Sequence, residues 1–178
     1  MDRRVQIMDE VTISRSLARI THEIIERNGG ANGLVILGIK SRGIAISKIL
    51  VENLKKFGGV EVESGILDVT MFRDDYTEQQ KKEKSTKSVV PCDLTDKIVV
   101  IVDDVLFTGR TARAGIEAVF SLARPKALQL AVLVDRGHRE IPIRPDYVGK
   151  NIPTSIKEKV VVQMNDGEEK GVFITQQN

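Results

Sequence analysis

The chain has 178 residues, of which 41% are hydrophobic, and its 27 basic and 25 acidic side chains leave a net charge of +2. This length predicts one compact domain, and the near balance of charge excludes a protein that binds polyanions over its whole surface. A single cysteine, Cys92, excludes an internal disulfide framework. No signal-peptide pattern and no apolar run near the ~20 residues of a membrane span are present, so we expect a soluble cytoplasmic protein without a membrane contact.

The start of the chain predicts a strand followed by a helix. Residues 5–8 favour a short strand. Asp9 or Thr12 is the predicted N-cap of a helix that runs to about Arg27, where Asn28 and two glycines close it. Its apolar side chains recur at helical spacing and are predicted to be buried; they are Ile13, Leu17, Ile20 and Ile24.

The next part of the chain repeats this order. A buried-type strand is predicted over residues 34–39, and a polar glycine turn at residues 38–43 leads into a second helix over residues 44–57. Residues 66–72 predict a third strand. The polar tract over residues 77–88 has almost nothing to bury, which is typical of a mobile segment.

An unbroken β-branched run over residues 98–102 predicts a strand covered on both faces, which we expect to stop at Asp103 and Asp104. A helix is predicted over residues 112–122. Its predicted buried side chains are Ile116, Val119 and Phe120.

The last third begins with an apolar strand predicted over residues 127–134. Residues 135–155 are rich in proline, glycine and charge, and we interpret them as an ordered loop and candidate lid. Residues 159–164 and 171–175 flank an Asn-Asp-Gly sequence, which predicts a closing hairpin. Strands that alternate with helices predict an α/β fold with right-handed crossovers and a mostly parallel sheet.

The sequence Thr108-Gly109-Arg110-Thr111 offers hydroxyls, a glycine and a cation at the start of a predicted helix, where a phosphate binds readily. It matches neither the nucleotide P-loop nor the dinucleotide glycine pattern. The two carboxylates just before it would repel an anion unless they meet hydroxyls or a metal. A sugar phosphate satisfies both requirements, with its phosphate on the turn and its ribose diol on the acids.

Strand, paired aspartates, Thr-Gly-Arg-Thr and helix together resemble the phosphoribosyl-diphosphate signature of the type I phosphoribosyltransferases. Four further segments make the chain similar to the family of bifunctional pyrimidine-operon attenuation regulators with uracil phosphoribosyltransferase activity; they are residues 38–43, 72–75, 133–140 and 147–155. The resemblance runs nearly end to end.

This resemblance implies a type I phosphoribosyltransferase fold over residues 1–178, with a mostly parallel central sheet flanked by helices and a small hood or lid. It implies a hood-like loop at about residues 135–155 and a flexible active-site loop at about residues 72–90. It also implies a homodimer or larger homo-oligomer.

The activity implied is the joining of uracil to phosphoribosyl diphosphate, which gives UMP and pyrophosphate. The transition state is oxocarbenium-like, so the protein contributes placement and charge control. Mg²⁺ is the implied cofactor, held mainly through substrate oxygens, with Asp103 and Asp104 as the candidate protein ligands.

The resemblance also assigns residues to each part of the site. The catalytic group comprises Asp103, Asp104 and Arg73. The 5-phosphate group comprises Thr108, Gly109, Arg110 and Thr111. The pyrophosphate group comprises Lys40, Ser41 and Arg42. The uracil pocket, which we expect to read the base through backbone hydrogen bonds, comprises Val134, Asp135, Arg136 and Ile156.

The second implied function is binding of the leader mRNA hairpin of the pyrimidine operon, controlled by UMP and UTP. Basic residues crowd the first helix and the late loop, and they are predicted to form one surface away from the catalytic turns. The candidate RNA-binding residues are Arg15, Arg19, His22, Arg27, His138, Arg139, Arg144 and Lys150.

Simpler interpretations stay open for each motif. The paired aspartates could also cap the next helix. Residues 40–42 also fit a solvated turn. Arg73 and the two aspartates that follow it also fit an exposed ion-pair cluster. The basic residues of the first helix also fit a solvated face. Three alternative functions remain: an enzyme whose basic surface is incidental, a regulator that keeps the site only as a nucleotide sensor, and a ribose-phosphate sensor without catalysis.

Overall fold

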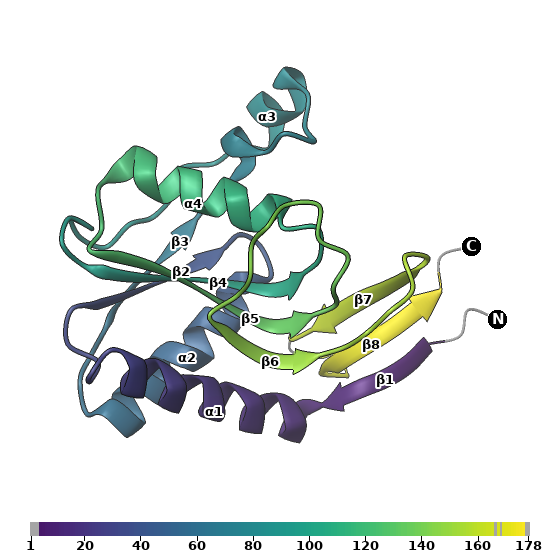
Figure 1. The fold of residues 1–178 in the computed structure, drawn as a ribbon, viewed down its shortest axis with the longest axis horizontal. Helices are drawn as coiled ribbons and strands as arrows, with labels where there is room; N and C mark the ends of the chain where they lie inside the picture. Colours follow the sequence, from purple (N-terminus) through teal and green to yellow (C-terminus); the bar gives the residue numbers. More distant parts are fainter. Residues whose placement is uncertain (1–3, 166, 168, 177–178) are drawn as a thin grey trace.

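The computed structural model describes residues 4–165, 167 and 169–176, and it is built around a sheet of five parallel strands (Figure 1). The strand order is β3-β2-β4-β5-β6. The strands are β2 (Leu34–Ile39), β3 (Glu63–Leu67), β4 (Ile98–Leu106), β5 (Ala127–Asp135) and β6 (Tyr147–Asn151). The predicted α/β class with a parallel central sheet is confirmed.

Helices cover both faces of this sheet (Figure 1). One face carries α1 (Glu10–Arg27) and α2 (Gly43–Gly58), and the other carries α4 (Arg110–Leu122). Two apolar cores result, because successive side chains of a strand point to opposite faces. In β4, Val100 and Val102 pack toward α1 and α2, whereas Val99 and Ile101 pack toward α4.

A second, smaller sheet joins the two ends of the described chain. It has the order β1-β8-β7, and both pairs are antiparallel. The strands are β1 (Arg4–Asp9), β7 (Glu158–Gln163) and β8 (Gly171–Gln176). The predicted pairing of the last two strands is confirmed, although Asp166 of the predicted turn lies outside the described residues. Figure 1 shows this sheet beyond the carboxyl ends of β4 and β5.

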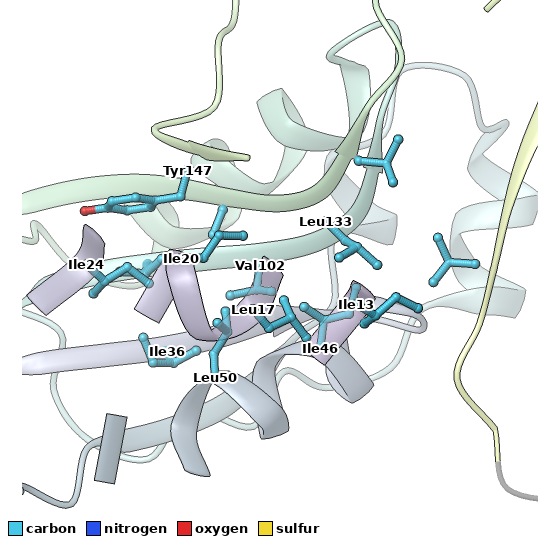
Figure 2. Close-up of a cluster of buried hydrophobic side chains, with 14 of the residues drawn as sticks. Ile13, Leu17, Ile20, Ile24, Ile36, Ile46, Leu50, Val102, Leu133 and Tyr147 are labelled. Atoms are coloured by element: carbon cyan, nitrogen blue, oxygen red, sulfur yellow. The ribbon is translucent and has the colours of Figure 1, made fainter. Parts of the chain in front are cut away.

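The first helix forms as its sequence predicts. The Asp9 carboxylate accepts a hydrogen bond of 2.8 Å from the backbone N–H of Thr12, which satisfies a donor that the helix itself leaves free. The predicted apolar stripe is confirmed, since its four isoleucine and leucine side chains are at most 2% exposed. Figure 2 shows these side chains together with Ile36, Leu50 and Val102 in one buried cluster.

Two predicted strand boundaries are wrong. The third strand covers Glu63–Leu67, and Thr70–Phe72 form a short 3-10 helix (η1) where the sequence predicted continued strand. The strand β4 does not stop at Asp103; it continues to Leu106, because its ladder with β5 runs on to Asp135. A run of apolar residues therefore indicates where the strand is covered on both faces, and backbone pairing decides where the strand ends.

Two further expectations need correction. The segment interpreted as loop contains β6, which pairs in parallel with β5 at the edge of the sheet. The polar tract contains a short helix, α3 (Glu78–Lys84), whose N-cap Thr77 forms a capping box with Gln80. Figure 1 shows α3 projecting from the rest of the chain, and no residue of this helix is buried. The predicted mobility of this tract and the hood-like role of residues 135–155 stay predictions.

The buried side of α4 also differs from its prediction. Phe120 is 56% exposed and Ile116 is only half-buried, whereas Val119 is buried as expected. Small residues form the contact instead: a Cβ added at Gly115 would lie 3.2 Å from the side chain of Ile39. The helix approaches the sheet so closely that alanine and glycine occupy positions that the pattern assigned to larger side chains.

We predict that Leu17→Ala lowers the free energy of unfolding by about 2–5 kcal/mol, because it leaves a cavity between α1 and the sheet. Leu17 is fully buried, whereas Val11 of the same helix is 55% exposed. The matched variant Val11→Ala should change stability by less than about 0.5 kcal/mol. Urea denaturation measures both, and equal losses would contradict the assigned burial.

Candidate active site at the carboxyl edge of the sheet

The turn between β4 and α4 has the geometry of an anion site. Gly109 is the N-cap of α4 and has a φ of 93°, a left-handed conformation that favours glycine. A Cβ there would also lie 3.3 Å from the carbonyl oxygen of Ile141. A cleft of about 370 Å³ opens beside the turn, and Arg73 and Glu140 line it together with residues 105–111. The structure thus brings the four predicted phosphate-turn residues around one cleft.

Arg73 reaches this cleft from a distant part of the chain. Its Nη1 donates a 2.8 Å hydrogen bond to the hydroxyl of Thr111, and its Nε donates a 2.7 Å bond to the carboxylate of Asp75. The bond to Asp75 raises the pKa of Arg73, so the guanidinium stays charged. The ion-pair interpretation is therefore confirmed for Arg73 and Asp75, and Arg73 also faces the predicted phosphate turn; its catalytic role stays a prediction.

Two acids to which the sequence analysis gave no role at the phosphate turn hold Arg110. Its Nε lies 2.6 Å from Glu140 and its Nη1 lies 2.5 Å from Asp74. The hydrogen bonds that Arg110 donates to Glu140 and then to Asp74 raise the pKa of Arg110. Backbone N–H groups of Glu140 and Ile141 also donate to the carbonyl oxygen of Thr108. Asp74 and Glu140 are 36 and 30 positions from Arg110 in the sequence, so no local spacing reveals them.

The paired acids lie within β4, next to the turn. The side chain of Asp104 is nearly buried, and its Oδ2 lies 3.7 Å from Nη1 of Arg42. The carboxylate of Asp103 accepts a 2.9 Å bond from the backbone N–H of Asp104. Burial, followed by repulsion from Asp104, raises the pKa of Asp103 well above its usual value. The acids therefore do not simply cap α4; they form part of the strand.

The predicted pyrophosphate residues lie between β2 and α2, beside these acids. A Cβ added to Gly43 would be 2.3 Å from the carbonyl oxygen of Val102, so this turn rests directly on β4. The peptide bond between Lys40 and Ser41 is cis. Ser41 and Arg42 are exposed. Lys40 extends toward the end of the active-site loop, where its Nζ donates a 3.0 Å bond to the hydroxyl of Thr86.

The predicted uracil residues are divided. Asp135 and Arg136 line a cavity of about 520 Å³ at the end of β5, whereas Val134 is fully buried in the core and Ile156 is 71% exposed. Arg136 is 6% exposed; its guanidinium lies 4.0 Å from the ring centre of Phe107, and its Nε donates to the hydroxyl of Thr154. Burial lowers the pKa of Arg136.

The basic residues of α1 are exposed, as predicted for a surface. Arg19 also binds within the chain, because its Nη2 donates to the carbonyl oxygens of Val148 at 3.0 Å and Gly149 at 2.6 Å. Arg27 pairs with Asp146 at 2.6 Å. Lys150 donates from its Nζ to the carbonyl oxygen of Ile7, and the ring of His22 stacks on that of Phe57.

The late-loop members of this set lie near the 520 Å³ cavity. Arg139 donates to the carbonyl oxygen of Phe107 at 2.9 Å and pairs with Asp135. His138 contacts the carbonyl oxygen of Thr154 at 2.6 Å, and Arg144 lines the cavity. The guanidinium of Arg139 therefore holds the loop against the phosphate turn, a role that the sequence did not reveal.

Residues 6–166 match the family of the phosphoribosyl transferase domain. The chain is 47% identical over 180 residues to a protein of Bacillus subtilis strain 168 named Bifunctional protein PyrR, covering 100% of this chain and 99% of that protein. It is 52% identical over 171 residues to the protein of the same name from Bacillus cereus strain AH820, covering 95% of each. A third, from Pelotomaculum thermopropionicum, is 51% identical over 173 residues, with 96% of each covered.

The chain belongs to the PyrR family of phosphoribosyltransferases. This membership confirms the predicted enzyme class and the predicted link between that activity and the regulation of pyrimidine biosynthesis. The fold of this PyrR-family chain is also similar to that of hypoxanthine phosphoribosyltransferase from Trypanosoma cruzi, with a TM-score of 0.74, 19% identity and 97% of each chain covered. For hypoxanthine-guanine phosphoribosyltransferase from Bacillus anthracis, the TM-score is 0.70 with 20% identity and the same coverage. The predicted type I fold is thereby confirmed.

The described part of this PyrR-family chain contains no group of three or more histidine, cysteine, aspartate or glutamate residues placed to hold a metal ion. The only carboxylates among the predicted site residues of β4 are Asp103 and Asp104. This donor set fits a hard cation that takes most of its ligands from substrate oxygens and water. Among the same described residues, no helix is both long and apolar enough to cross a bilayer.

We predict that Asp103→Asn stabilises the folded chain at neutral pH. Because the folded chain resists ionisation of Asp103 while the unfolded chain ionises it at its usual pKa, stability falls as pH rises from that value toward the raised folded pKa. Asparagine removes this fall. Urea denaturation from pH 4 to pH 8 should show a stability gain over the wild type that grows with pH.

Asp93→Asn is the control of opposite sign. Hydrogen bonds from Thr95 lower the pKa of Asp93, so its contribution to stability is present above the usual pKa and is lost on acidification. This variant should be less stable than the wild type at neutral pH and equal to it in strong acid. If Asp103→Asn follows the wild type at every pH, the assigned shift is wrong.

Proposed function

We propose that this chain transfers the phosphoribosyl group of phosphoribosyl diphosphate to uracil, and that it also binds the leader mRNA hairpin of the pyrimidine operon under the control of UMP and UTP. One observation carries the enzymatic part. In a PyrR-family chain, the phosphate turn after β4, the acids of β4 and the turn after β2 converge at one edge of the sheet. Ligands of open α/β sheets bind at this edge.

The 5-phosphate is proposed to bind at the N-terminus of α4. Free backbone N–H groups and the helix dipole favour an anion there. The hydroxyls of Thr108 and Thr111 add donors, and Arg73 already bonds to Thr111. Side-chain oxygens of Asp103 and Asp104 then accept hydrogen bonds from the ribose hydroxyls, which are donors.

The diphosphate is proposed to bind on Lys40, Ser41 and Arg42. Asp103 and Asp104 are the candidate residues to hold Mg²⁺, which would neutralise charge on the leaving group. The chain itself contributes the ammonium of Lys40 and the guanidinium of Arg42. The guanidinium of Arg42 lies 3.7 Å from the carboxylate of Asp104. A diphosphate placed there lies between the acids that hold its ribose and the cations that hold its far end.

In the reaction, a bond forms between uracil N1 and the anomeric carbon, and the bond from that carbon to the diphosphate oxygen breaks. The electron pair leaves with pyrophosphate, and N1 gives up its proton. Fixing both reactants in register contributes about 7–11 kcal/mol, against about 3–4 kcal/mol for one aimed donor. Positioning is therefore the larger effect, and the loop of residues 72–90 is proposed to exclude water when it closes.

Uracil is proposed to lie at the end of β5, where backbone groups of Val134 to Arg136 read its polar edge and Ile156 covers its face. The exposure of Ile156, 71%, leaves an apolar side chain available for that contact. Arg136 supports this placement because it is buried next to Phe107 and carries donors only, which suits the carbonyl oxygens of uracil.

The RNA surface is proposed to centre on the exposed face of α1, extended by Lys150. The late-loop residues His138, Arg139 and Arg144, predicted for the same surface, lie instead beside the cavity at the end of β5. Folded RNA is bound through phosphates and 2′-hydroxyls, so cations and hydrogen-bond donors suffice. We also infer a cytoplasmic homodimer or larger assembly, on the family resemblance. The alternative is a regulator that keeps the site only as a nucleotide sensor; it predicts binding of phosphoribosyl diphosphate without release of pyrophosphate.

We predict that Asp104→Asn lowers kcat/KM for conversion of radiolabelled uracil to UMP by about a hundredfold, because the ribose loses a charged acceptor and its alignment. Asp93→Asn, an exposed change in the loop before β4, should leave the rate unchanged. Wild-type protein that binds phosphoribosyl diphosphate but forms no UMP would support the sensor instead.

We predict that Arg15→Gln weakens binding of the leader hairpin and lowers the slope of log affinity against log salt by about 1, as loss of one phosphate contact requires. Arg15 is exposed on α1 and is more suitable than Arg19, whose guanidinium bonds to β6. Gel shifts with and without UMP measure the effect. Lys126→Gln, an exposed change just before β5, is the matched control and should leave RNA binding unchanged. Uracil conversion should survive in both variants. A loss of catalysis in parallel with RNA binding would contradict two separate sites.

A further inference from the structure

Asp68 lies at the end of β3, outside every group of site residues assigned above, and its contacts are unusual for a residue in that place. Its side chain is only 3% exposed. One carboxylate oxygen accepts from the backbone N–H of Thr70 at 2.8 Å. The other accepts from the backbone N–H of Thr86 at 2.7 Å and from the Thr86 hydroxyl at 2.6 Å. A local turn explains the first bond, but the other two join segments 18 residues apart.

Lys40 of the predicted pyrophosphate turn contacts the same two residues, Thr86 and Asp68. The Nζ of Lys40 donates to the Thr86 hydroxyl at 3.0 Å and lies 3.8 Å from the Asp68 carboxylate. The backbone N–H of Lys40 donates to the carbonyl oxygen of Leu67 at 3.0 Å. A hydroxyl can accept one bond while it donates another, so Lys40, Thr86 and Asp68 form a continuous chain.

The charge of Asp68 makes this chain strong. Burial raises the pKa of Asp68, but hydrogen bonds from Thr70 and Thr86 lower it by more, so the pKa lies below its usual value. The carboxylate is therefore ionised at neutral pH. A buried anion needs donors or a cation, and Thr86 and Lys40 supply them.

Thr86 stands at the second end of the active-site loop. The first end is held on α4, where Arg113 donates to the carbonyl oxygen of Phe72 at 2.7 Å and Arg73 donates to Thr111. Between these ends, α3 has no buried residue. The backbone N–H of Asp68 also donates to the hydroxyl of Ser88 at 2.9 Å. The loop is thus anchored at both ends: Asp68 holds Thr86 and Ser88 at the second end, next to a backbone bridge between Ile66 and Val89.

We propose that Asp68 is a positioning residue that couples the pyrophosphate turn to the second end of the active-site loop through Thr86 and Lys40. This rests on the proposed function, in which the turn binds diphosphate. Thr86 and Asp68 hold the ammonium of Lys40 in place, and a diphosphate on the turn adds a further acceptor for the same ammonium. Occupation of the turn is therefore transmitted to residues 84–88, where the loop joins the body of the protein.

The first test is Asp68→Asn in the full chain, followed by amide hydrogen exchange. Without substrate, amides of residues 84–88 should exchange about tenfold faster than in the wild type, as expected for the loss of a charge-assisted hydrogen bond. Phosphoribosyl diphosphate with Mg²⁺ should change exchange at residues 84–88 in the wild type and not in the variant. The KM for phosphoribosyl diphosphate should rise about tenfold while the KM for uracil stays within about twofold.

Asp93→Asn is the matched control, because Asp93 also accepts a bond from a backbone N–H, that of Thr95 at 2.9 Å, in an exposed loop. It should leave exchange at residues 84–88 and both KM values unchanged. A second pair covers the case in which Asp68→Asn fails to fold: Thr86→Val removes the hydroxyl that joins Lys40 to Asp68, and Thr86→Ser keeps it. The valine variant should reproduce the faster exchange and the higher KM, and the serine variant should restore both.

Unchanged exchange at residues 84–88 in Asp68→Asn, or equal behaviour of the two Thr86 variants, overturns the proposal. Wild-type protein without uracil conversion would overturn the proposed function alone, since exchange in the substrate-free protein and its response to phosphoribosyl diphosphate do not depend on turnover.

Discussion

The site depends on the extension of β4 beyond the end of its neighbour β2. Up to Val102, this strand is paired with β2 on one side and β5 on the other. From Asp103 to Leu106 it is paired with β5 alone, because the chain leaves β2 to form the turn at Lys40. The acids therefore stand on a rigid, half-paired end of the strand. A hydrogen-bonded strand holds side chains more precisely than a loop does, which is what an oxocarbenium-like reaction needs.

Arginine–carboxylate pairs hold the loops around this strand. Arg110 joins the phosphate turn to Glu140 and Asp74, Arg73 pairs with Asp75, and Arg139 pairs with Asp135. The two pairs of Arg110 are exposed and therefore weak, so an incoming phosphate displaces them at little cost. The protein's own acids thus balance the cations that the substrate is proposed to use, and they also order the loops that carry those cations.

The sequence predicted the class of the fold and the phosphate turn because both depend on local patterns. Apolar runs marked the buried strands, Asp9 marked a helix start, and Thr-Gly-Arg-Thr marked an anion turn. The prediction was wrong for residues 66–72 and for Phe120, and it missed β6. In each case a longer-range contact decides the outcome: the pairing of β6 with β5 orders a segment of loop-like composition, and the close approach of α4 to the sheet favours small residues over large ones.

By itself, the sequence determined the chemistry at the end of β4: two carboxylates, two threonine hydroxyls and a glycine that permits the turn, all within nine residues. Only the tertiary structure decided the partners of the charged groups, since Arg73 with Thr111, Lys40 with Thr86 and Arg139 with Phe107 are 32 to 46 positions apart. Local spacing sets which groups a turn presents. Which groups meet is set by the packing of strands and helices, and no short stretch of sequence contains that information.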